Sequence, residues 1–255
     1  MLPDFPRPTR DQWQAQAEKG LKGRSLSDFD WIDTDGQTVS PLYGATDEGP
    51  PVSAPRPTDA EGRAWDVRSL IEGDDAVAVN AAVLAELEGG AASVIVRGAV
   101  TADAEPLSRA LMAVALELAP VGLDAGFDGP DAANALAVVA KGSPRAQLLF
   151  HMDPISAFAE AGGSPRPIHE HLLLSANTGF RHIGAYPQAR LFMASGRIAH
   201  EAGSSTGQEL GFATASAIGH LRAGLEAGMS AAQCLDAMVI GLSVDAEYFE
   251  SLAKI

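Results

Sequence analysis

The stretch "ARLFMASGRIAHEAGSSTGQELGFATASAIGHLRAGLEAG", residues 189–228, carries a pattern that repeats along most of the chain. It opens with a short apolar run, 189–195, which is typical of a strand buried on both faces. The segment 206–228 has the apolar periodicity of a helix and ends at a glycine. A strand followed by a helix predicts one βα unit of a parallel sheet.

The residues between the strand and the helix include several hydroxyls that resemble parts of an active site. Ser205 with Gln208, or Thr206 with Glu209, matches the S/T-x-x-E/Q capping box, which explains these hydroxyls without catalysis. Gly228 predicts a left-handed stop. One helical stripe, which we expect to face the core, consists of Leu210, Ala217, Leu221 and Leu225.

The same alternation extends on both sides of this unit. Short apolar runs typical of buried strands occur at 92–100, 121–126, 146–153, 189–195 and 238–244. Helix-period segments lie between and after them, at 74–90, 102–118, 130–142, 155–163, 168–180, 206–228 and 245–255. About five strands alternating with helices predict an α/β fold with a parallel sheet, either doubly wound or of barrel type. No G-x-G-x-x-G follows the first of these strands, which disfavours a dinucleotide-binding sheet.

The first 60 residues have a different composition. A short helix is predicted at 10–23 and a hairpin around Asp35 and Gly36, and a proline-rich connector follows at 46–62. The few large apolar residues of this region cannot close a core of their own. We therefore interpret 1–60 as an arm and connector that wraps another surface, and 61–255 as the α/β region.

Composition and charge limit the function classes. The chain has 255 residues, 46% of them hydrophobic but only 6% aromatic, so the core must be built from Ala, Leu, Val and Ile. The net charge of −15 argues against binding to nucleic acid and to anionic membranes. The one cysteine, Cys234, is predicted to be a buried structural thiol. With no apolar run of about 18 residues and no signal core, we expect a soluble cytoplasmic protein.

Five collinear segments match motifs of one protein family. Residues 195–228 resemble S-G-Y-H-x-x-E-A-G-A followed by Q-E-L-A-F and a glycine-rich helix, and 63–73 resemble R-P-W-x-I-R-Q-Y-A-G. The others are "VSPLYGATD" at 39–47, "LLFHMDPISAFAEAG" at 148–162 and "DAEYFESLAKI" at 245–255. In order and spacing, the chain resembles the methylmalonyl-CoA mutase family over nearly its whole length.

The resemblance implies a (βα) TIM barrel through which coenzyme A threads, and a separate cobalamin domain. In the family, homolysis of the cobalt–carbon bond drives a radical 1,2-shift of the thioester carbonyl group. Members assemble as homodimers, or as heterodimers of a catalytic and a non-catalytic subunit. With about five of eight strands expected here, the predicted barrel is incomplete.

Several positions depart from the family pattern at its reaction site. Ile198 and Arg197 stand at the histidine and the tyrosine of S-G-Y-H, Leu70 at the tyrosine of R-Q-Y, and His151 at the glutamine of T-I-Q-N-D. The S-x-T-M strand appears as "VGLDAG", and the cobalamin-ligating D-x-H-x-x-G does not occur in this sequence. Isoleucine has no hydrogen-bond donor for a thioester oxygen. We therefore expect no catalytic residues and no cobalamin bound by this chain.

Other positions are retained or remain candidates for binding. The resemblance places Arg63 and Arg68 along the coenzyme A entrance and matches Glu201 to the acid of E-A-G-A. His151, with Asp153, follows a strand where barrel enzymes place catalytic groups. We interpret Arg63, Arg68, His151 and Glu201 as vestigial substrate-binding candidates. Their structural alternatives include an Arg68–Glu72 pair at helical spacing.

The remaining histidines do not suggest a metal site. "HEAGS", beginning at His200, lacks the second histidine of H-E-x-x-H. His169 and His171 are two residues apart, so they would point to different faces of a helix.

Three hypotheses follow, and we favour the first. The chain is a non-catalytic small subunit, or a fragment of one, in a methylmalonyl-CoA mutase heterodimer, with adenosylcobalamin on its partner. Alternatively, it is the acyl-CoA-binding barrel of an active mutase that uses a separate cobalamin-binding chain. In the third, it is a self-associating scaffold without a mutase partner.

Overall fold

The computed structural model describes residues 8–43, 65–246 and 248–254, and it divides into two units, Met1–Arg56 and Pro57–Ile255. Arg63 and the whole of the predicted connector, 46–62, lie outside the described residues. The described part of the first unit contains α1 (Arg10–Lys19), a 3-10 turn η1 (Leu26–Phe29) and the hairpin strands β1 (Trp31–Ile32) and β2 (Thr38–Val39). Neither α1 nor η1 buries a residue.

The predicted hairpin around Asp35 and Gly36 is confirmed. Strands β1 and β2 pair antiparallel, with Ile32 opposite Thr38. The Asp33 carboxylate accepts the backbone N–H groups of Asp35 and Gln37 at 2.9 and 2.8 Å, and Gly36 has a φ of +79°. An aspartate that holds its own turn explains why so short a hairpin forms.

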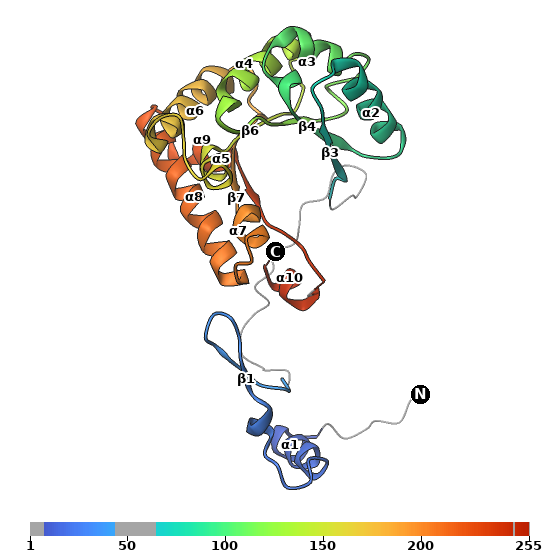
Figure 1. Cartoon of the computed structure of the whole chain (residues 1–255), viewed down its shortest axis with the longest axis vertical. Helices are drawn as coiled ribbons and strands as arrows, with labels where there is room; N and C mark the ends of the chain where they lie inside the picture. Colours follow the sequence, from blue (N-terminus) through green and yellow to red (C-terminus); the bar gives the residue numbers. More distant parts are fainter. Residues whose placement is uncertain (1–7, 44–64, 247, 255) are drawn as a thin grey trace. The chain divides into compact units, whose positions relative to one another are not determined.

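The second unit is a curved parallel sheet covered by helices on one side (Figure 1). Its strands are β3 (Arg68–Glu72), β4 (Ser93–Arg97), β5 (Val121–Asp124), β6 (Leu148–Met152), β7 (Arg190–Ser195) and β8 (Met238–Gly241). All pairs are parallel and neighbours in the sheet are neighbours in sequence, in the order β3-β4-β5-β6-β7-β8. This winding, without a reversal of strand order, is that of a TIM barrel and not of a doubly wound sheet. In the described residues β3 and β8 do not pair, so the barrel is not closed.

Helices follow the strands along the chain, and the larger ones cover the convex face (Figure 1). They are α2 (Ala76–Glu88), α3 (Ala104–Ala110), α4 (Gly129–Val139), α5 (Pro154–Ala161), α6 (Ile168–Ile183), α7 (Arg197–Glu201), α8 (Thr206–Glu226), α9 (Ala231–Asp236) and α10 (Tyr248–Lys254). Short 3-10 turns precede α3, precede α4 and follow α4: η2 (Ala99–Thr101), η3 (Gly126–Asp128) and η4 (Ala140–Gly142). No helix of the described residues combines the length and apolar character of a membrane span.

The core lies between the convex face of the sheet and these helices. It is built mainly from Ala, Val and Leu, as the low aromatic content predicts, with Val83, Val94, Leu107 and Leu136 fully buried. Cys234 is also buried, with a sulfur atom that a Cβ at Gly224 would approach to 2.4 Å. Burial raises the pKa of the Cys234 thiol, in agreement with a structural role.

The sheet has six strands where the sequence predicts about five, and β3 is the additional one. In β3 only Ile71 is buried. The strand lies at an edge, and its concave-side residues are not covered, so its sequence lacks the continuous apolar run of the other strands. This position also excludes the helical Arg68–Glu72 pair, because residues 68–72 are extended.

Two helix predictions need correction. The predicted helix at 102–118 ends at Ala110, because the Asn80 amide donates to the carbonyls of Ala110 and Met112 at 3.0 and 2.8 Å and Ala113 has a φ of +66°. In α8 the capping box of Ser205 and Gln208 and the stop at Gly228 are confirmed. The predicted core stripe holds in part: Leu221 packs against the core, whereas Leu210 and Leu225 are exposed. The buried positions of α8 are Glu209, Ala213, Ser216, His220, Ala223 and Gly224.

Candidate functional site

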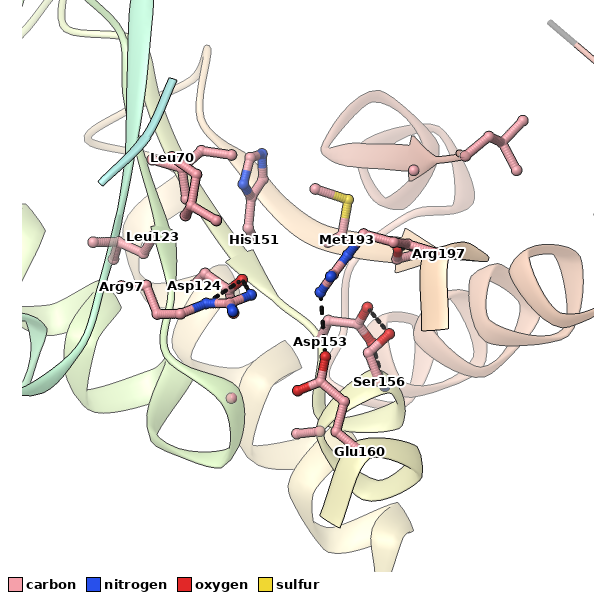
Figure 2. A pocket seen from close by; sticks show the side chains of 16 residues that line it. Leu70, Arg97, Leu123, Asp124, His151, Asp153, Ser156, Glu160, Met193 and Arg197 are labelled. Carbon is pink, nitrogen blue, oxygen red and sulfur yellow. Dashed lines mark hydrogen bonds and ion pairs between the residues drawn. The ribbon is translucent and has the colours of Figure 1, made fainter. Parts of the chain in front are cut away.

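A pocket of about 300 Å³ lies at the carboxyl ends of the strands, on the concave side of the sheet (Figure 2). Its apolar part includes Leu70, Ile95, Leu123 and Met193. Its polar part consists of Arg97, Asp124, His151, Asp153, Ser156, Glu160, Ser195 and Arg197. This is the end of a barrel at which enzymes of this fold carry their functional groups.

His151 reaches the pocket through an irregularity in β6. The register between β6 and β7 shifts between Leu149 and Met152, and His151 has a φ of +46°, a strained value for a residue with a side chain. Its ring packs against Gly122, where a Cβ atom would lie 3.3 Å from the ring. Gly122, the first glycine of "VGLDAG", therefore leaves room for the imidazole.

The His151 imidazole is buried, neutral and incompletely hydrogen-bonded. The residue is 6% exposed, and its Nε2 atom has no hydrogen-bond partner within the described residues. Burial and, to a lesser extent, the charge of Arg68 lower the pKa of His151 to about 4. Near pH 7 the ring is therefore uncharged and can offer Nε2 as a donor or an acceptor, depending on its tautomer.

Arg97 and Asp124 form an ion pair at the pocket. They are register partners at the ends of β4 and β5. The Arg97 Nε donates to Asp124 Oδ2 at 3.1 Å, and Nη2 contacts the same oxygen. The hydrogen bond to Asp124 raises the pKa of Arg97 above its ordinary value. The positive charge of Arg97 is therefore matched locally.

Arg197 is paired in the same way on the opposite side. Its Nη2 lies 3.2 Å from Glu160 of α5, and its Nη1 lies 2.8 Å from Glu201, one turn along α7. Asp153 caps α5, where it accepts the Ser156 backbone N–H at 3.0 Å and the Ser156 hydroxyl at 2.6 Å. Figure 2 shows Arg197, Glu160, Asp153 and Ser156 around one rim of the pocket.

Comparison with known proteins identifies the family of this fold and site. The family model for methylmalonyl-CoA mutase matches residues 98–255. The chain belongs to the methylmalonyl-CoA mutase family. The five collinear motifs and the six consecutive parallel strands agree with this assignment.

Curated relatives are similar along most of the chain. The methylmalonyl-CoA mutase small subunit of Streptomyces virginiae is 30% identical over 276 residues, which cover 99% of this chain and 44% of the relative. The small subunit of Propionibacterium freudenreichii subsp. shermanii is 29% identical over 280 residues, covering 99% and 43%. A probable small subunit of Mycobacterium tuberculosis (strain ATCC 25618 / H37Rv) is 31% identical over 237 residues, covering 86% and 37%. The chain thus spans about two fifths of the length of the curated relatives it matches.

The structure brings one of the described binding candidates into the pocket of this mutase-family chain. His151 lines the pocket, whereas Arg68 begins β3, where its Nε donates to Ser93 Oγ at 2.7 Å, and it is not a lining residue. Glu201 does not line the pocket either and contacts it only through Arg197. Arg63 lies outside the described residues. Of the three candidates within the described residues, His151 alone lines this pocket.

The two family positions with apolar replacements also differ in their placement. Leu70 lines the pocket at the end of β3. Ile198 is half-buried on α7 and is not among the lining residues. Of these two replacements at the family's reaction-site positions, Leu70 alone lies in the pocket.

Sequence reasoning missed Arg97, Asp124 and Glu160 and noted Arg197 only as a replacement. Arg97 and Asp124 are the last residues of β4 and β5. The signal that selects His151, a polar residue at the carboxyl end of an apolar run, applies equally to both of them. Glu160 could not be found this way, because it lies on α5 and reaches Arg197 only in the folded chain.

The other histidines lie outside the pocket. His171 is buried and His169 is exposed, so the two do point to different faces of α6, as predicted. His200 lies 3.5 Å from Glu209, a buried carboxylate that also binds Lys254 at 2.7 Å. In the described residues no group of three His, Cys, Asp or Glu side chains could hold a metal ion.

Proposed function

We propose that this chain is the barrel region of a non-catalytic small subunit of a methylmalonyl-CoA mutase. In this role it supports the isomerisation of methylmalonyl-CoA and succinyl-CoA by a catalytic partner subunit in a heterodimer. The observation that carries the proposal is the state of the pocket arginines. Both of them, Arg97 and Arg197, already pair with carboxylates.

The charges of the pocket argue against the binding of an acyl-CoA substrate. The methylmalonyl group and the coenzyme are anionic, and an anion in a partly buried site needs a cation or several donors. Here two arginines face the carboxylates of Asp124, Asp153 and Glu160. An anionic acyl group would therefore have to displace a carboxylate from an arginine before it could bind.

The same pocket offers little to the family's radical chemistry. The resemblance assigns a tyrosine to the position of Leu70, whose side chain has no polar atom. Cobalamin supplies the radical chemistry of the family when it is bound. This sequence has no D-x-H-x-x-G motif, and the pocket of about 300 Å³ is small for a corrin ring, so its residues do not fit that cofactor. We therefore assign adenosylcobalamin to the partner.

The first unit supplies a surface suited to a partner. Trp31, Ile32 and Tyr43 are 53%, 71% and 70% exposed, which is unusual for large apolar side chains so close in sequence. Such a segment gains stability when it packs on another chain, in agreement with the interpretation of this region as a wrapping arm. Self-association through the same residues is the competing assembly.

Co-purification with a catalytic mutase subunit tests the proposal. We expect a stable 1:1 complex by light scattering, with mutase turnover by the complex and none by the isolated chain. The double variant Trp31→Ala/Ile32→Ala should weaken the complex by about tenfold or more, because interface aromatics often contribute more than 2 kcal/mol. Val138→Ser, an equally exposed apolar position on α4, is the matched control. Turnover by the isolated chain, or no complex at micromolar concentration, would contradict the proposal.

A further inference from the structure

The pocket has features of a binding site for a ligand of a different class. A volume of about 300 Å³ is at the lower end of the range for small-molecule sites, and its walls are largely apolar. One polar group in it has no partner. His151 is 94% buried, yet its Nε2 atom has no hydrogen-bond partner in the described residues, which is costly unless something binds there.

We propose that this pocket binds a small uncharged molecule with an apolar body and one hydroxyl or carboxamide group, which hydrogen-bonds to His151 Nε2. A hydroxyl or carboxamide can both donate and accept, so it suits either tautomer of the neutral imidazole. The apolar body would lie against Leu70, Ile95 and Met193. Figure 2 shows the His151 ring projecting from β6 between Leu70 and Met193.

The charges around the pocket set the selectivity. Asp124 and Glu160 occupy Arg97 and Arg197, and Asp153 is a further carboxylate beside Ser156. The lining therefore has one more negative than positive charge. An anionic ligand is repelled by this net negative charge, whereas an uncharged ligand is not. This inference goes beyond the proposed subunit role and does not depend on a partner.

Two probes of equal apolar body test the selectivity. The full chain, labelled with ¹⁵N at its six histidines, is titrated with benzyl alcohol and with benzoate near pH 7. We expect saturable shifts of the His151 ring signals with benzyl alcohol, and binding of benzoate that is weaker by about tenfold or more. The His171 ring, also buried with an unpartnered Nε2 but outside the pocket, should not shift.

Three variants separate the pocket from nonspecific effects. His151→Phe should abolish the binding of benzyl alcohol as measured by ligand-observed NMR, and His171→Phe should retain it. Glu160→Gln releases Arg197 from one carboxylate and should raise the affinity for benzoate by about threefold or more. Glu160 is half-exposed, so this variant is expected to fold normally and keeps the test valid if His151→Phe does not fold.

Each outcome decides for or against the inference. Preferential binding of benzyl alcohol that is lost in His151→Phe, together with improved benzoate binding in Glu160→Gln, supports it. Equal or tighter binding of benzoate to the unaltered chain would overturn the predicted selectivity. No shift of His151 at millimolar benzyl alcohol would also overturn it, since an unpartnered Nε2 atom would then be satisfied by water alone.

Discussion

At the scale of single residues, His151 combines backbone strain with an unusual ionisation state. Its positive φ and its buried ring are both held by the packing around β6, including the space left by Gly122. Strain of this kind costs about 1–3 kcal/mol and is concentrated at functional positions in proteins. Under the proposed non-catalytic role, we expect this strained position to serve binding or the fold and not radical chemistry.

The pKa of His151 predicts how stability depends on pH. Its folded pKa is about 4, below the ordinary value of 6.5. Below pH 6.5 the unfolded chain therefore binds a proton that the folded chain does not, so stability falls as the pH decreases toward 4. The contribution of this residue between pH 7.5 and pH 5 is a loss of about 2 kcal/mol.

The variant His151→Gln isolates this effect. Its free energy of unfolding, measured with urea at both pH values, should lose about 2 kcal/mol less than that of the unaltered chain between pH 7.5 and pH 5. His169→Gln, at an exposed position, should behave like the unaltered chain. The same pH dependence in His151→Gln and the unaltered chain would show that the imidazole is not buried in its neutral form.

Asn80 provides a second prediction at the residue scale. Its side-chain amide donates to the carbonyls of Ala110 and Met112, and the residue is buried. Asn80→Ala should lower the free energy of unfolding by about 2–3 kcal/mol, because a buried and a partly buried carbonyl lose their donor. Asn177→Ala, at an exposed position, should change it by less than about 0.5 kcal/mol. Equal effects of the two substitutions would contradict this role of Asn80.

At the scale of elements, α8 and α10 are joined by a buried ion pair. Lys254 Nζ lies 2.7 Å from Glu209 Oε2, and both side chains are almost completely buried. The Ser243 backbone N–H donates to the other carboxylate oxygen at 2.6 Å. Burial alone would raise the pKa of Glu209, but the hydrogen bonds from Lys254 and Ser243 together lower it. The carboxylate is therefore stabilised in its charged form.

Removal of one partner should detach α10. Lys254→Met leaves Glu209 buried without its cation, which typically costs about 3–5 kcal/mol. We expect hydrogen exchange in residues 248–254 to become much faster, while the double variant Glu209→Met/Lys254→Met recovers part of the protection. Lys141→Met, at an exposed position, should have no effect. Unchanged exchange in Lys254→Met would show that the ion pair does not hold α10.

The same elements show how far the sequence could predict the fold. The strands β4 to β8 are predicted from their apolar runs, and the cap of α8 is predicted from Ser205 with Gln208. The buried stripe of α8 is not predictable from hydrophobicity, because it contains Glu209 and His220. The charge of Glu209 is stabilised in the interior by Lys254 and by the Ser243 backbone N–H, both of which are distant in sequence.

The candidate site was predictable in part, for a related reason. A polar residue at a strand end is a local signal, and it identifies His151. The ion pairs that determine the charge of the pocket depend on residues from different elements, as in the pair of Arg197 with Glu160. A single sequence does not contain that information. Arg68 is a second example, because the register of β3 and β4 places its partner Ser93 beside it.

At the scale of the whole molecule, the proposed function divides architecture and ligand binding between two chains. The described sheet has six consecutive parallel strands, and its pocket has no arginine without a carboxylate partner. The proposed heterodimer therefore holds its acyl-CoA and its cobalamin on the catalytic partner. Self-association without a mutase partner predicts instead that the isolated chain forms dimers at micromolar concentration in light scattering.

The number of acyl-CoA sites tests this division most directly. Isothermal titration calorimetry with methylmalonyl-CoA should give no saturable heat with the isolated chain and one site per heterodimer with the reconstituted complex. One saturable site on the isolated chain, or two sites per heterodimer, would contradict the claim that this barrel has no acyl-CoA site of its own.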